Sequence, residues 1–240
     1  MCPNYHFHRK MRILESFIID IMLNSYHNER FSQMDYVILS NNNTDFRESS
    51  VRGCDMNTVE IRWHGRGGQG VVTANEILAA AALKEGKYIK AFPEFGPERM
   101  GAPIRAFARI SEKPINVHSQ VYYPNFVMVL DPTLLSNPGV KEGLSEKSHV
   151  IANYGEGNER LRAVFGNYDV HAVNATKISL EEIGRPMANT AMLGALVKIS
   201  KIVDLNTVTS ELAAKFAGKF SQDVINKNVR AVVRAYEEVQ

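Results

Sequence analysis

The sequence predicts an α/β fold with three layers, in which a mainly parallel sheet with one antiparallel hairpin lies between two layers of helices. Short apolar segments alternate with helical ones from Met56 onward, and this alternation is typical of parallel sheets. The composition, with 45% hydrophobic and 22% charged residues, is that of a globular protein. A chain of 240 residues is also long enough to bury a large core.

The first predicted element after Met56 is a strand, because apolar and polar residues alternate over 59–63. A glycine-rich loop at 65–70 separates this strand from a helix predicted at 71–84, which is rich in alanine, leucine and isoleucine. A second strand is expected at 88–92, where apolar side chains return. A strand, a glycine loop and a helix in this order form a unit that often binds ligands.

A segment rich in proline and glycine follows the second strand. These residues recur over 93–103, so we expect an ordered loop there rather than a helix or strand. The segments 104–110 and 115–117 are expected to form an antiparallel hairpin across 111–114. The nearly continuous apolar run at 126–130 is typical of a buried strand in an α/β sheet.

The last third of the chain completes the sheet and supplies most of the helices. Short apolar segments at 150–153 and 170–173 predict two further strands. Three helical segments are then expected at 189–202, 207–216 and 221–239. Helices between and after parallel strands imply that both faces of the sheet are covered.

The first 55 residues differ from the rest. Apolar residues at helical spacing over 13–21 predict one short amphipathic helix, and the polar run at 41–44 is typical of a loop or of disorder. We expect residues 1–55 to be a poorly ordered extension, with a start site that was assigned too far upstream as the main explanation. An accessory arm that docks on a partner is the alternative. The domain itself is expected to span 56–240.

Composition and charge exclude several classes of protein. The chain has 28 Lys and Arg against 26 Asp and Glu, without a dense basic run, so no nucleic-acid partner is expected. The apolar stretch 13–23 is too short to cross a bilayer, and no signal peptide is expected there because acids interrupt the stretch and no small-residue cleavage site follows. Cys2 and Cys54 are too few for a disulfide framework, so a reduced, cytoplasmic protein without a membrane partner is expected. No metal site is expected, because four histidines of the domain show no ligand spacing: His64, His118, His149 and His171.

The glycine-rich loop is the strongest chemical feature of the sequence. Gly65, Gly67 and Gly70 have the G-x-G-x-x-G spacing. The helix that follows presents unpaired N–H groups, which attract an anion by about 0.3–1 kcal/mol. Arg66 could add a charge-assisted contact to a phosphate or a carboxylate. A tight turn needed only for packing is the alternative, but it does not explain why Arg66 and Gln69 lie in the loop.

A nicotinamide site is one interpretation of this loop. Such a site needs an acid at the end of the second strand to hold the ribose hydroxyls, whereas here prolines follow that strand and only Glu94 is available. A stand-alone oxidoreductase that uses NAD(P) or flavin is therefore an alternative function rather than the leading one. A non-catalytic module that senses a nucleotide or coenzyme A is a third hypothesis.

Three motifs together point to a known family. They are GRGGQGVVTA at 65–74, FPEFGPERMGAP at 92–103 and GRPMANTAMLG at 184–194. On these motifs, residues 56–240 resemble the gamma subunit of 2-oxoacid:ferredoxin oxidoreductases, the pyruvate group in particular. Met100 stands where relatives often carry a second arginine, which leaves the role of that position open.

The resemblance implies a function in pyruvate synthase, which converts pyruvate, coenzyme A and oxidised ferredoxin into acetyl-CoA, carbon dioxide and reduced ferredoxin. A branched-chain or 2-oxoglutarate specificity is the alternative. It also implies alpha, beta and delta partner subunits, with ferredoxin contacted through the complex. The resemblance also implies that thiamine diphosphate, magnesium and [4Fe–4S] clusters belong to those partners, and residues 56–240 are consistent with this, since they contain no cysteine and no Gly-Asp-Gly stretch. The chain would then be inactive alone and have no catalytic side chain of its own.

By the same resemblance, the chain helps to receive coenzyme A, whose phosphates suit a helix N-terminus beside an arginine. The expected contact residues are Gly65, Arg66, Gly67, Gly68, Gln69, Gly70, Glu98, Arg99, Asn189 and Thr190. A structural ion pair or a subunit contact is the alternative for Arg99, and a helix cap is the alternative for Asn189 with Thr190. Asp131, at the end of an apolar strand, is expected to cap a helix before Thr133, with a site carboxylate as the alternative.

Overall fold

The computed structural model describes residues 58–94 and 101–240, which all belong to one unit spanning 36–240. The extension expected at 1–55 lies outside the described residues. The strands are β1 (Val59–Arg66), β2 (Tyr88–Glu94), β3 (Pro103–Ser111), β4 (Phe126–Val129), β5 (His149–Asn153) and β6 (Asp169–Val173). The helices are α2 (Val71–Lys84), α3 (Pro138–Lys141), α4 (Asn158–Phe165), α5 (Ala175–Ile183), α6 (Ala188–Ser200), α7 (Leu205–Phe216) and α8 (Gln222–Glu238), with a 3-10 turn η2 (Pro132–Leu134).

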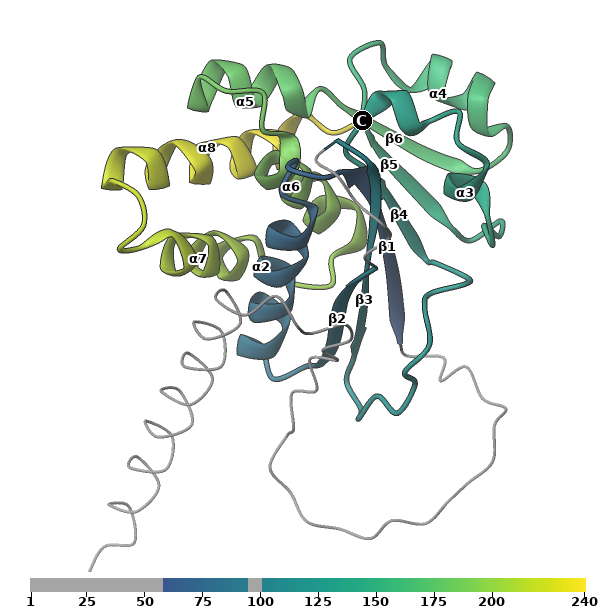
Figure 1. Ribbon diagram of the computed structural model, residues 1–240, viewed down its shortest axis with the longest axis horizontal. Coiled ribbons are helices and arrows are strands. Elements are labelled where there is room, and N and C mark those ends of the chain that lie inside the picture. The colour runs from purple at the N-terminus through teal and green to yellow at the C-terminus, as the bar shows by residue number, and fades with distance from the viewer. Residues whose placement is uncertain (1–57, 95–100) are drawn as a thin grey trace, which may run out of the picture. The chain divides into compact units, whose positions relative to one another are not determined.

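The six strands form one mixed sheet in the order β2-β3-β1-β4-β5-β6. β1, β4, β5 and β6 pair in parallel, whereas β3 runs antiparallel to both of its neighbours, β1 and β2 (Figure 1). The predicted α/β class is therefore confirmed, as is the mainly parallel sheet with an antiparallel part. Because β1 and β4 are parallel neighbours, the loops after them meet at the same edge of the sheet.

The predicted hairpin partner at 115–117 is wrong, since this segment forms no strand. The segment 104–110 lies in β3, both edges of which are already paired with β1 and β2. The chain after β3 is instead held by side chains: Lys90 donates to the carbonyl of Val117 at 3.2 Å, and Arg109 donates to the carbonyls of Ser119 and Gln120.

β2 extends two residues further than expected, through Pro93 to Glu94. Proline lacks the N–H that an inner strand needs, and β2 tolerates it because it lies at one end of the order of the described strands. The loop expected at 93–103 therefore begins later than the sequence indicates. β3 likewise begins at Pro103.

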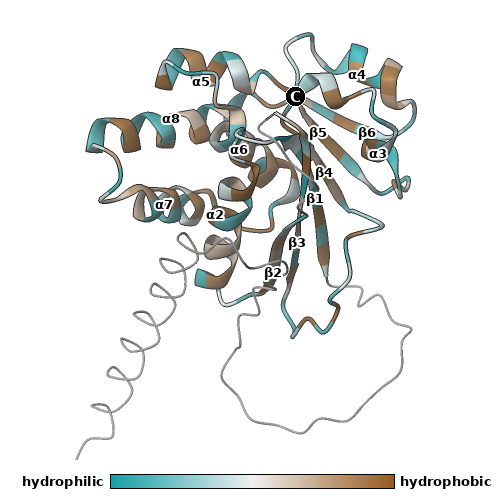
Figure 2. Ribbon diagram, in the orientation of Figure 1, coloured by the Kyte–Doolittle hydropathy of each residue, from teal (hydrophilic) through white to brown (hydrophobic). Residues whose placement is uncertain are grey.

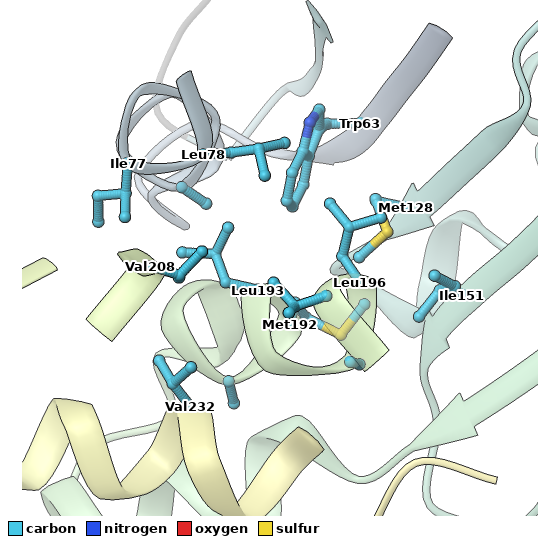
Figure 3. Packing of buried hydrophobic residues seen from close by; sticks show 14 of the residues in the cluster. Trp63, Ile77, Leu78, Met128, Ile151, Met192, Leu193, Leu196, Val208 and Val232 are labelled. Atoms are coloured by element: carbon cyan, nitrogen blue, oxygen red, sulfur yellow. The ribbon is translucent and has the colours of Figure 1, made fainter. Parts of the chain in front are cut away.

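Helices cover both faces of the sheet, as predicted. α2 and α5 to α8 lie over one face, where the larger core contains Trp63 of β1, Met128 of β4 and most of α6 (Figures 1 and 3). η2, α3 and α4 cover the other face of β4 to β6, around a smaller core with Val127 and Leu161. Alternate residues of β4, β5 and β6 thus serve different cores, as the period of two requires.

α6 is the central helix of the larger core. All residues from Ala188 to Val197 are buried, and Leu193 and Leu196 lie among side chains of β1, β4 and α2 (Figure 3). Figure 2 shows the same pattern, with hydrophobic residues along α6 and the strands and a mixed surface on α8. Since α6 is packed on all sides, its N-terminal residues have a fixed position next to the glycine loop.

The predicted helices at 71–84, 189–202, 207–216 and 221–239 are confirmed to within two residues at either end. The short helices α3, α4 and α5 were not predicted, because their few apolar positions give a weak helical period. α5 has clear boundary signals nonetheless: the Asn174 side chain accepts from the Lys177 amide, and Gly184 ends the helix. Within the described residues, every helix is too short or too polar to cross a bilayer.

Candidate functional site: the loop between β1 and α2

The glycine loop connects the end of β1 to the start of α2. Gly65 and Arg66 are the last residues of β1, and α2 begins at Val71. Gly70 is the N-cap of α2 with φ of 74°, a left-handed conformation that strongly favours glycine, and no side chain caps this helix. The first helical hydrogen bond runs from the Ala74 amide to the Gly70 carbonyl, so the preceding amides of α2 have no partner within the helix.

Three amides of the loop are occupied and several are not. The Arg66 amide donates to Gln69 Oε1 at 2.8 Å, Gly67 to the Ala102 carbonyl at 2.9 Å, and Gln69 to the Arg66 carbonyl at 3.0 Å. Among the described residues, nothing accepts from the amides of Gly68 and Gly70, or from those of the first three residues of α2. Within the described residues, five N–H groups therefore remain for an external acceptor.

The Arg66 side chain is held in place by three contacts. Its Nε donates to Asp131 Oδ2 at 3.1 Å, one Nη to the Gly101 carbonyl at 3.1 Å, and the other Nη to Thr133 Oγ1 at 2.8 Å. Gln69 Nε2 donates to the same carboxylate oxygen at 2.7 Å. Both non-glycine residues of the loop are thus tied to Asp131, which explains their presence there.

Asp131 is a buried, ionised carboxylate. Burial by itself would raise its pKa, but hydrogen bonds from the Thr133 hydroxyl and amide and from Gln69, together with the charge of Arg66, hold the pKa of Asp131 below its usual value. The predicted capping role is confirmed, because Asp131 is the N-cap of η2 and accepts from the Thr133 amide at 2.9 Å. Its ion pair with Arg66 was not predicted.

The second motif lies beside the first. The Gly101 amide donates to the Gly67 carbonyl at 3.2 Å, and Arg66 pairs with Pro103 across β1 and β3. Residues 101–103 therefore border the loop. Glu98 and Arg99, which were expected to contact a ligand, lie outside the described residues.

The third motif supplies a side chain to the loop. Asn189 Nδ2 lies 3.4 Å from the Gly70 carbonyl, whereas the Thr190 hydroxyl bonds to Asn228 of α8 and is buried. The capping alternative for this pair is wrong: the N-cap of α6 is Met187, and no side chain caps that helix. Asn189 thus lies at the loop and Thr190 at the interface between α6 and α8.

Two buried polar side chains of β1, Arg62 and His64, contact each other near the site, and this pair was missed from the sequence. Arg62 is 1% exposed and donates from Nε to His64 Nε2 at 3.0 Å. Burial lowers the pKa of His64 to about 3, and the charges of Arg62 and Arg105 contribute to the shift. His64 is therefore neutral at physiological pH, and its Nε2 is an occupied acceptor. In the sequence, the only sign of the Arg62–His64 pair is the alternation of charged and apolar residues along β1.

The arrangement favours an anion. Unpaired amides at a helix N-terminus carry partial positive charge, and Arg66 is about one-third exposed beside them. The loop is thus suited to bind a phosphate or a carboxylate.

Comparisons with known proteins show which family this chain resembles. A family model described as pyruvate ferredoxin/flavodoxin oxidoreductase matches residues 60–238. The pyruvate synthase subunit PorC of Thermotoga maritima is 50% identical over 182 residues, which cover 75% of this chain and 94% of the relative. The common gamma subunit of the pyruvate and ketoisovalerate oxidoreductases of Pyrococcus abyssi is 45% identical over 184 residues, or 76% of this chain and 97% of the relative. A crystal structure of pyruvate oxidoreductase subunit PORC from Thermotoga maritima superposes with a TM-score of 0.69 at 46% identity, covering 77% of this chain and 98% of the other.

Proposed function

We propose that this chain, which belongs to the pyruvate ferredoxin/flavodoxin oxidoreductase family as a gamma subunit, binds part of coenzyme A in the reaction of pyruvate synthase. It is a subunit of an oxidoreductase complex with several subunits. The set of unused amides between β1 and α2, next to a fixed arginine, supports the coenzyme A proposal. A diphosphate needs donors of this kind.

In the proposed reaction, pyruvate, coenzyme A and oxidised ferredoxin give acetyl-CoA, carbon dioxide and reduced ferredoxin. We assign thiamine diphosphate, magnesium and the [4Fe–4S] clusters to the alpha, beta and delta subunits, and the contact with ferredoxin to the complex. Residues 56–240 have no cysteine and so offer no thiolate to a cluster. The role of this chain is to bind and orient coenzyme A. The thiol of coenzyme A reacts in a partner subunit.

Arg66 has the capacity to contact a phosphate without leaving Asp131. A guanidinium has five N–H donors, and the contacts to Asp131, Gly101 and Thr133 use three of them. Two N–H groups remain on a side chain whose position is already fixed. Such a group loses little conformational entropy when a ligand binds, which favours affinity.

Asp131 limits the net charge of the site. It remains ionised beside Arg66, so the pair carries little net charge and the amides of α2 supply most of the attraction. Asp131 and Gln69 are thus positioning residues for Arg66. Phosphate binding far from the thiol provides energy that orients the reacting end of coenzyme A.

Changing Arg66 to alanine tests the proposal. In the assembled enzyme, Arg66→Ala is expected to raise the apparent KM for coenzyme A about tenfold or more, because a charge-assisted hydrogen bond is worth about 1.5–3 kcal/mol. The KM for pyruvate and the rate at saturating coenzyme A should change little. Steady-state kinetics with a viologen dye as electron acceptor measures all three.

Two variants serve as controls. Arg160→Ala removes an exposed arginine of α4 whose ion pair within the described residues is with Glu156, and it should leave the KM for coenzyme A unchanged. Asp131→Asn breaks the same ion pair but leaves the Arg66 guanidinium in the site and removes a negative charge, so the KM for coenzyme A should rise less than in Arg66→Ala. A similar increase in Asp131→Asn and Arg66→Ala would indicate a purely structural role for Arg66. An unchanged KM in Arg66→Ala would remove Arg66 from the site.

A second substrate class is also proposed. The relative from Pyrococcus abyssi is named as a subunit common to pyruvate and ketoisovalerate oxidoreductases. A gamma subunit that only holds coenzyme A would suit either 2-oxoacid, because the acid binds elsewhere. Assays that compare the rate of the native complex with pyruvate and with ketoisovalerate show which of these 2-oxoacids it uses.

A further inference from the structure

Two histidines that are distant in sequence meet at the far end of the sheet from the glycine loop. His149 is the first residue of β5, and Asp169 and His171 are the first and third residues of β6. The parallel register pairs His149 with Asp169, and His171 lies two residues further on the same face. The sequence spacing gave no sign of this cluster, because the register of β5 and β6 creates it.

The donor atoms of the three side chains converge. His149 Nδ1 lies 2.9 Å from Asp169 Oδ2 and 3.4 Å from His171 Nε2, and His171 Nε2 lies 3.5 Å from Asp169 Oδ1. All three ligand atoms lie within 4.8 Å of one another. Ligands of one tetrahedral ion with bonds of about 2.1 Å are about 3.4 Å apart, so the spacing suits a single small cation.

The orientation of His171 is fixed by a second contact. Its Nδ1 lies 3.1 Å from the main-chain oxygen of Gln240, which can only accept a hydrogen bond, so Nδ1 carries the proton. In the neutral ring Nε2 then presents a lone pair to His149 and Asp169. Metal-binding histidines usually show this arrangement, in which the other ring nitrogen donates to an oxygen.

A metal ion can take the place of a proton in this cluster. His149 Nδ1 faces both Asp169 Oδ2 and His171 Nε2, so either a proton on His149 Nδ1 or a cation joins the three groups. His149 is held in place by stacking on Phe126, with ring centroids 5.1 Å apart. The cluster is open to solvent, since the Asp169 side chain is 54% exposed, so an ion can enter.

We propose that His149, Asp169 and His171 bind one divalent transition-metal ion, with zinc as the best match. Two imidazoles and one carboxylate form a common donor set for zinc and leave a fourth position for water or a partner group. The ion would join β5 to β6, which is the edge strand of the sheet. It would also fix the main chain at Gln240 through His171. This inference does not depend on coenzyme A binding.

Titration of the full, metal-depleted chain with Co²⁺ tests the site. We expect one equivalent to bind with the visible spectrum of a four- or five-coordinate ion, and Zn²⁺ to displace it and to raise the melting temperature. Asp169→Asn, His171→Ala and the variant with both changes should bind at least about tenfold more weakly. His118→Ala is the matched control, since His118 contacts Lys90 in another part of the sheet and should not affect binding.

The wild-type spectrum alone can overturn the proposal, even if a variant fails to fold. Absence of a bound Co²⁺ spectrum contradicts it. The chain also contains His6, His8, His27, Cys2 and Cys54, which are potential metal ligands. Equal Co²⁺ affinity in the double variant would show that these residues, and not the cluster, bind the ion.

Discussion

Replacing Gly194 by alanine is expected to lower the free energy of unfolding by about 2–3 kcal/mol, a typical cost of overpacking a core. A Cβ at this position would lie 2.0 Å from the Val232 carbonyl oxygen and 3.0 Å from the Tyr236 nitrogen. Both are main-chain atoms of α8, so relief requires α6 and α8 to separate. The gain from alanine over glycine in a helix, about 1 kcal/mol, is too small to compensate.

Chemical denaturation of the full chain measures this loss. Gly218→Ala is the matched control: it has φ of 75° but no atom within 4 Å of an added Cβ, so only backbone strain of about 1–2 kcal/mol is expected. A loss in Gly194→Ala no greater than in Gly218→Ala would contradict the tight packing of α6 on α8. Because α6 also carries Asn189, a shift of this helix should weaken coenzyme A binding as well.

The second large effect is expected at the glycine loop itself. Gly70→Ala forces alanine into φ of 74° and brings its Cβ to 2.3 Å from Asn189 Nδ2. We expect the backbone strain to cost about 1–2 kcal/mol and the overlap to add to it. If the loop shifts in response, its amides lose their alignment, and the KM for coenzyme A should rise at least as much as in Arg66→Ala.

Adding Asn189→Ala to Gly70→Ala separates the backbone strain at position 70 from the steric overlap with the Asn189 side chain. In the double variant Gly70→Ala with Asn189→Ala, the overlap is gone and only the φ penalty remains, so the two losses of stability should not add. Chemical denaturation of the wild type, the two single variants and the double variant gives the coupling energy between positions 70 and 189. Strict additivity would contradict the close contact between Asn189 and Gly70, and an unchanged KM in Gly70→Ala would argue against a role of the loop in binding.

Much of the fold was predictable from the sequence. Alternation at 59–63, the apolar run at 126–130 and the helical period at 71–84 each correspond to an observed element. These signals are strong because each element buries one face or both. The hairpin at 115–117 failed for a reason that is not local, since β2 and β1 had already paired both edges of β3.

The site was predictable only in part. Glycine spacing located the loop, but the ion pair of Arg66 with Asp131 depends on β1 and β4 being neighbours, which no local pattern shows. The same applies to His149 and His171, which lie 22 residues apart and meet only through strand register. Contacts between distant segments depend on the register and order of the strands, so a single sequence predicts the elements better than the side chains that they bring together.

Hydrogen exchange of the loop amides in the assembled enzyme tests the proposed role most directly. Coenzyme A and dephospho-coenzyme A both carry the diphosphate, and each should slow exchange at Gly68, Gly70 and the first three residues of α2. Pantetheine carries no phosphate and should leave these amides unprotected. Unchanged exchange with coenzyme A, or equal protection by pantetheine, would show that the loop does not hold the diphosphate.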